Sequence, residues 1–75
     1  MTPRRSYEVV VSGRLSGVVA ESLAPLSVTA RNGATTISGA GFDAAMLAGV
    51  LRMIERLGLE LIAVHSSVAD EPEPG

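Results

Sequence analysis

The sequence predicts an α+β domain in which a four-stranded antiparallel sheet carries two helices on one face, in the order βαββαβ. Three observations predict this class. Short β-branched segments bounded by turn residues alternate with two segments of helical periodicity. An Asn-Gly pair separates two of the β segments. The segment 44–57 repeats apolar residues at helical spacing between two capping residues.

A chain of 75 residues has room for one domain. We expect that domain to span residues 7–68. Residues 1–6 are predicted to be a disordered N-terminal arm, and residues 69–75 a disordered acidic tail rich in proline. A domain this small buries only about 60–65% of its unfolded surface, so we expect association with another chain to add stability.

The first third of the chain predicts a strand followed by a helix. Tyr7–Val11 is short and β-branched, and three consecutive valines are typical of a central strand that is apolar on both faces. Ser16 is the expected N-cap of a helix that runs to Ala24, because Pro25 disfavours helical geometry in the residue before it.

The middle of the chain predicts a β-hairpin. Leu26–Ala30 alternates apolar and polar residues, and Thr35–Ser38 returns as its partner strand. Between them, Asn32 and Gly33 suit the two central positions of a type I′ turn, which require positive φ. This is the strongest short-range signal in the first half of the chain.

The last third predicts a capped helix and a final strand. Asp43 is the expected N-cap, the apolar face continues to Leu57, and Gly58 suits a left-handed C-cap. Leu59–His65 completes the set as a strand. The resulting order is typical of the ferredoxin-like arrangement, in which right-handed crossovers place both helices on one face of the sheet.

Strict alternation along the first and last strands predicts an exposed aliphatic cluster. The residues expected to face the helices are Val9, Val11, Leu61 and Ala63. The opposite face then carries Val10, Ile62 and Val64 beside a half that is rich in hydroxyl groups. We interpret this cluster as a candidate interface. The alternative interpretation is that a few exposed aliphatic residues are ordinary on a sheet.

Composition excludes several classes of function. The absence of cysteine excludes disulfides and thiolate metal sites, and one histidine, His65, cannot hold a metal by itself, so no metal or cofactor is expected. Residues 6–68 are close to neutral, which argues against a nucleic-acid partner. The apolar segments are too short to span a membrane, and we expect a cytoplasmic protein. No catalytic constellation is evident, and the role of His65 stays open.

The loop after the first strand is a candidate anion-binding site. Gly13, Arg14, Ser16 and Gly17 stand between a strand and a helix N-terminus, where exposed N–H groups and a guanidinium could hold an anion. The segment Gly13-Arg14-Leu15-Ser16-Gly17-Val18 resembles the loop of the acylphosphatase family. That family's phosphate-binding arginine corresponds to Glu21 here, so the resemblance implies an anion-binding domain without the catalytic arginine.

A broader resemblance covers most of residues 7–64. Tyr7–Val11, the Gly13–Ser16 turn and the segment Leu47–Val64 resemble short stand-alone bacterial proteins of uncharacterised function. The resemblance implies the ferredoxin-like fold and carries no activity.

The leading hypothesis is therefore a non-catalytic binding or regulatory module that self-associates as a homodimer and binds a protein or a small ligand. Its interface would be the outer sheet face or an edge strand. The alternative is an anion- or phosphate-binding, enzyme-like domain related to acylphosphatases.

Overall fold

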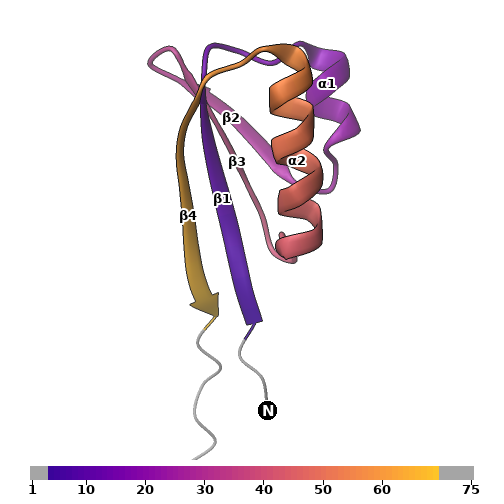
Figure 1. The fold of residues 1–75 in the computed structure, drawn as a ribbon, viewed down its shortest axis with the longest axis vertical. Helices are drawn as coiled ribbons and strands as arrows, with labels where there is room; N and C mark the ends of the chain where they lie inside the picture. Colours follow the sequence, from indigo (N-terminus) through magenta and orange to yellow (C-terminus); the bar gives the residue numbers. More distant parts are fainter. Residues whose placement is uncertain (1–3, 70–75) are drawn as a thin grey trace, which may run out of the picture.

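The computed structural model describes residues 4–69, which form a four-stranded antiparallel sheet and two helices (Figure 1). This confirms the predicted α+β class. The elements in chain order are β1 (Arg4–Ser12), α1 (Gly17–Ser22), β2 (Ser27–Arg31), β3 (Ala34–Ser38), α2 (Ala44–Leu57) and β4 (Leu61–Ala69).

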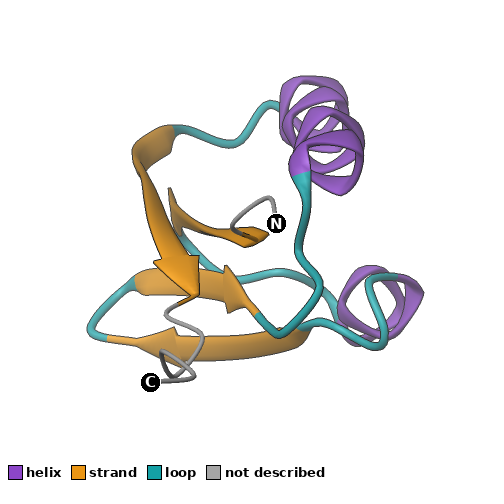
Figure 2. Cartoon of the chain, turned by 90° about the horizontal axis from the view of Figure 1, so that it is seen from below, coloured by secondary structure: helices purple, strands orange, loops and turns teal. Residues whose placement is uncertain are grey.

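The sheet has the strand order β2-β3-β1-β4, and each neighbouring pair is antiparallel. β1 is therefore hydrogen-bonded on both sides, whereas β2 and β4 form the two edges. Figure 2 shows both helices on the same side of the curved sheet. The other side, which we call the outer face, carries no helix.

The core lies between the sheet and α2. Its residues come from β1, β3, α2 and the two loops that precede β2 and α2, and they are Val9, Val11, Leu26, Ile37, Phe42, Val50 and Ile54. α2 packs on β1 through its apolar face. α1 contributes no fully buried residue. Most of the burial that stabilises the domain therefore comes from β1, β3 and α2.

The local signals in the sequence have the expected structural consequences. The Asp43 carboxylate accepts a hydrogen bond of 2.9 Å from the Met46 N–H, and Gly58 ends α2 in the left-handed conformation. Asn32 and Gly33 both have positive φ in the hairpin turn. Ser16 caps α1 as predicted, but that helix ends at Ser22 and is shorter than expected.

Two strands are longer than the sequence predicted. β1 begins at Arg4 and β4 ends at Ala69, because residues 4–6 pair with residues 67–69. Placing residues 4–6 in a disordered arm, and residue 69 in a disordered tail, was therefore wrong. The remainder of the predicted arm, residues 1–3, and residues 70–75 of the predicted tail lie outside the described residues.

The predicted alternation along β4 is wrong because a β-bulge interrupts the pairing of β4 with β1. Val10 lies opposite Ala63, but the next residue of β1, Val11, lies opposite Leu61. Ile62 is thus the extra residue of the bulge. Directly opposed residues share a face of the sheet.

The bulge divides the predicted cluster. Val64 lies opposite the buried Val9 and shares its helix-facing side, whereas Ala63 shares the outer face with Val10. Val10, Ile62 and Val64 therefore do not form one patch on the outer face. Leu61 lies opposite the buried Val11 and therefore on the helix-facing side, as predicted. The extra residue of the bulge places Leu61 and Ala63 on opposite faces of the sheet.

A buried hydroxyl ties the loop after β1 to β3. Thr35 is fully buried, and its hydroxyl donates a hydrogen bond of 2.6 Å to the Gly13 carbonyl oxygen. The Gly13 N–H donates in turn to the Gly33 carbonyl oxygen at 2.7 Å. These two hydrogen bonds hold the start of the loop against the hairpin.

Truncating a core valine is expected to destabilise the domain far more than truncating an exposed one. Val9→Ala removes methyl groups from a fully buried site, and we expect a loss of about 2 kcal/mol or more in the free energy of unfolding. The matched control is Val18→Ala, because Val18 is 80% exposed; its effect should stay within about 0.5 kcal/mol. Urea denaturation measures both, and equal losses would contradict the core described above.

Removing the Thr35 hydroxyl is expected to destabilise the domain because the Gly13 carbonyl loses its partner. Thr35→Val keeps the shape of the side chain, and we expect a cost of about 1–3 kcal/mol. Thr36→Val is the control, since Thr36 is a neighbour on the opposite, outer face. Thermal or urea unfolding that ranks the two variants in the reverse order would argue against a structural role for this hydrogen bond.

Candidate functional site

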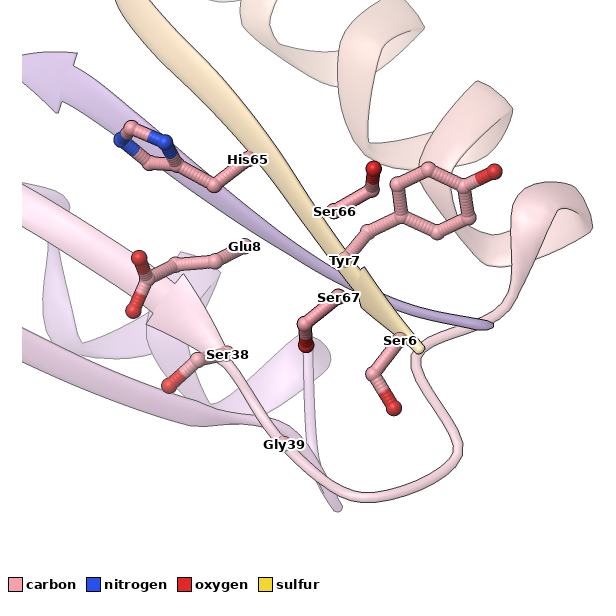
Figure 3. A pocket seen from close by; sticks show the side chains of 8 residues that line it. All are labelled: Ser6, Tyr7, Glu8, Ser38, Gly39, His65, Ser66 and Ser67. Carbon is pink, nitrogen blue, oxygen red and sulfur yellow. The ribbon is translucent and has the colours of Figure 1, made fainter. Parts of the chain in front are cut away.

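The outer face contains a polar hollow of about 270 Å³ near the free ends of β1 and β4 (Figure 3). Its lining comes from β1, β4 and the end of β3, and consists of Ser6, Tyr7, Glu8, Ser38, Gly39, His65, Ser66 and Ser67. Glu8 and His65 are directly opposite each other in the β1–β4 ladder. Their side chains project to the same side of the sheet in Figure 3, with Ser38 next to Glu8.

The chemistry of the hollow is that of a carboxylate, an imidazole and several hydroxyl groups. Tyr7 and Ser66 are also opposed in the ladder but project to the helix-facing side (Figure 3). Glu8 is half-buried and His65 is exposed. Among residues 4–69, the side chains of Glu8, Ser38 and His65 make no hydrogen bond to one another or to other described residues. The arrangement can therefore offer both oxygen and nitrogen ligands to a solute.

The sequence left the role of His65 open and did not indicate Glu8 as a residue of a candidate site. The two residues are far apart in the chain, and their pairing depends on the register of β4 against β1. No local pattern in the sequence encodes that register, because the bulge at Ile62 shifts it by one residue. The part of the chain that the structure describes holds no cluster of three or more His, Cys, Asp or Glu side chains able to bind a metal ion.

A second surface is an apolar groove of about 360 Å³ between α2 and the start of β4. Its apolar lining is Leu51 and Ile54 from α2, Leu59 from the connecting loop and Leu61 from β4. Arg52 and Glu55 of α2 also border it. Leu61 is 44% exposed although it faces the helix side of the sheet, so α2 covers the neighbouring strand β1 better than it covers β4.

The edge strand β4 directs backbone groups into solvent. The Tyr7 N–H donates to the Phe42 carbonyl, on the β3 side of β1, and the Ser12 N–H donates to the Glu60 carbonyl, on the β4 side. The backbone N–H and C=O groups of even-numbered residues of β1, including Glu8, therefore point to β4 and hydrogen-bond with it. The backbone N–H and C=O groups of His65, which lies opposite Glu8, hydrogen-bond to β1. Those of its neighbours Val64 and Ser66 therefore point to the free edge of the sheet.

The predicted anion-binding residues lie in the loop between β1 and α1. Arg14, Ser16 and Gly17 are exposed there. The Gly13 N–H already donates to Gly33, and the Ser16 hydroxyl oxygen accepts from the Val19 N–H at 3.3 Å. Two of the polar groups proposed for anion binding therefore serve the fold in this structure. Glu21, on α1, is exposed and adds a negative charge close to the loop.

The predicted interface residues are distributed over both faces of the sheet. Val10 is half-buried on the outer face, and Val64 is 40% exposed on the helix-facing side. Ile62, at the bulge, is 54% exposed. These three residues and Leu61 all lie near the β4 edge of the sheet, but they do not share one face of it.

Comparisons with known proteins place the chain in a family. No helix among the described residues has the length and apolar character needed to cross a membrane. No curated protein and no solved structure matches the chain. One family model, described as a domain of unknown function (DUF8691), matches residues 6–65. The matched segment begins at Ser6 in β1 and ends at His65 in β4. The chain therefore belongs to the family of DUF8691 domains.

Proposed function

We propose that this domain is a non-catalytic binding module that works as a homodimer, in which β4 of one copy pairs with β4 of a second copy. The observation that carries the proposal is the unpaired edge of β4. Antiparallel pairing of two identical strands is self-complementary, as a two-fold axis requires. A second copy of the chain is therefore the partner that this edge fits.

The composition of β4 supports pairing with another strand. Natural sheets protect exposed edges with charges, prolines or very short strands. β4 is nine residues long, and Leu61–Ala69 contains no proline, lysine, arginine or carboxylate. The opposite edge, β2, has five residues and ends in Arg31. The contrast favours β4 as the edge that is covered in the functional assembly.

The apolar groove supplies the rest of the interface. Two nine-residue strands lie together over about 30 Å, and a single sheet edge is about 10 Å thick, which gives about 300 Å² on each partner. A stable interface buries about 800 Å² on each partner. The missing area lies next to β4, where Leu51, Ile54 and Leu61 line the groove. Burying the exposed parts of Leu51 and Leu61 adds a hydrophobic contribution that the strand edge lacks, whereas Ile54 is already buried in the core.

The ferredoxin-like topology belongs to the same proposal. Its support is the order of elements, βαββαβ, together with the strand order β2-β3-β1-β4 and antiparallel pairing throughout. In that arrangement each helix connects two strands that are separated by a third. In that topology β4 is an edge strand. Self-association through β4 leaves the outer face of the sheet uncovered.

Sedimentation velocity is expected to show a dimer at micromolar concentration that a charge on β4 dissociates. Ile62→Lys places an ammonium at the interface and should raise the dimer dissociation constant at least about tenfold, equivalent to 1.4 kcal/mol. Thr29→Lys is the matched control on the other edge strand and should leave the dimer intact. A monomer at high micromolar concentration, or equal effects of both variants, would refute the proposed interface.

Amide hydrogen exchange is expected to locate the interface on individual residues. The amides of Val64 and Ser66 should be protected in the dimer and should lose protection on dilution or in Ile62→Lys, because they point to the free edge. The His65 amide serves as the internal control, since it bonds to β1 in either state. Protection that does not depend on concentration at Val64 and Ser66 would contradict pairing through β4.

A further inference from the structure

The proposed dimer places two histidines beside its axis. His65 is the middle residue of β4 (Leu61–Ala69), so the register that pairs the full length of two β4 strands puts His65 opposite His65 of the second copy. This step rests on the proposed function. It turns the single histidine of the chain into a pair of imidazoles on one face of an extended sheet.

The backbone pattern brings these imidazoles close together. Because His65 bonds toward β1, the His65 pair across the axis is a non-hydrogen-bonded pair of the new ladder. Such pairs have Cα atoms about 4.5 Å apart and side chains closer than at hydrogen-bonded positions. Val64 and Ser66 on either side provide the backbone hydrogen bonds that hold this register. Both imidazoles then project from the outer face, where His65 projects in Figure 3.

Glu8 occupies the place of a supporting residue. It lies opposite His65 on β1, on the side away from the second copy, and its side chain projects to the same face (Figure 3). Histidines that bind metal commonly donate their other ring N–H to a carboxylate, which sets the tautomer and strengthens the ligand. Ser38 and Ser67 line the same hollow and leave space for water molecules around an ion.

We propose that the dimer axis carries a site for one divalent transition-metal ion, with zinc as the probe. The two His65 imidazoles bind the ion, the two Glu8 carboxylates orient them, and water completes the coordination. Imidazole ligands favour zinc, nickel and copper over magnesium and calcium, which prefer oxygen. One chain supplies too few ligands alone, in agreement with the absence of a three-residue cluster among residues 4–69.

Isothermal titration calorimetry of the untagged protein with zinc tests the site. We expect one ion per two chains. His65→Ala should abolish binding, and Glu8→Gln should weaken it about 10–100-fold, as loss of a supporting carboxylate does. Ser12→Ala, on the same face at the other end of β1, is the control and should leave zinc affinity unchanged. Sedimentation should show that zinc tightens the wild-type dimer and not the His65→Ala dimer.

The outcomes separate this inference from the proposed function. A dimer that binds no zinc refutes the metal site and leaves self-association standing. One zinc per chain, or binding that survives His65→Ala, refutes the shared axial site. A monomer with no zinc binding refutes both. Magnesium in place of zinc should give no heat, and equal affinity for the two ions would refute the assignment to imidazole ligands.

Discussion

The pairing of β4 with β1 is the interaction on which the rest of the structure depends. β1 pairs with β3 on one side and β4 on the other, and its Val9 and Val11 are fully buried on the face that packs against α2. β4 takes its orientation from β1 alone. A shift of one residue in that register would move every side chain of β4 to the opposite face. The two candidate surfaces of the molecule therefore follow from one ladder of hydrogen bonds.

The β-bulge at Ile62 shows how this constraint shapes the surface of the domain. It lets Leu61 face the groove beside α2 while His65, four residues later, faces outward opposite Glu8. Along an uninterrupted strand, residues four apart would share a face. The inserted residue therefore makes one edge strand serve an apolar surface at one end and a polar surface at the other. Bulges commonly re-aim side chains in this way near functional sites.

Local signals predicted much of the fold because their physics is local. The Asn32-Gly33 turn, the Asp43 cap and the Gly58 C-cap each depend on the φ values or hydrogen bonds of a few adjacent residues. The order of the six elements follows from them. Strand ends were less predictable, since residues 4–6 are strand only because residues 67–69 lie beside them. The same holds for α1, whose early end at Ser22 has no equally clear signal.

The sequence by itself determined the class of the domain, the hairpin, the capped helix α2 and the exclusion of disulfides. The tertiary structure decided which residues share a face, because cross-strand neighbours are set by register over more than fifty residues of intervening chain. It separated Val64 from Val10 and brought Glu8 to His65. His65 is the single histidine of the chain, and the position of β4 at the sheet edge is what allows the proposed two-fold axis to place a second His65 beside it.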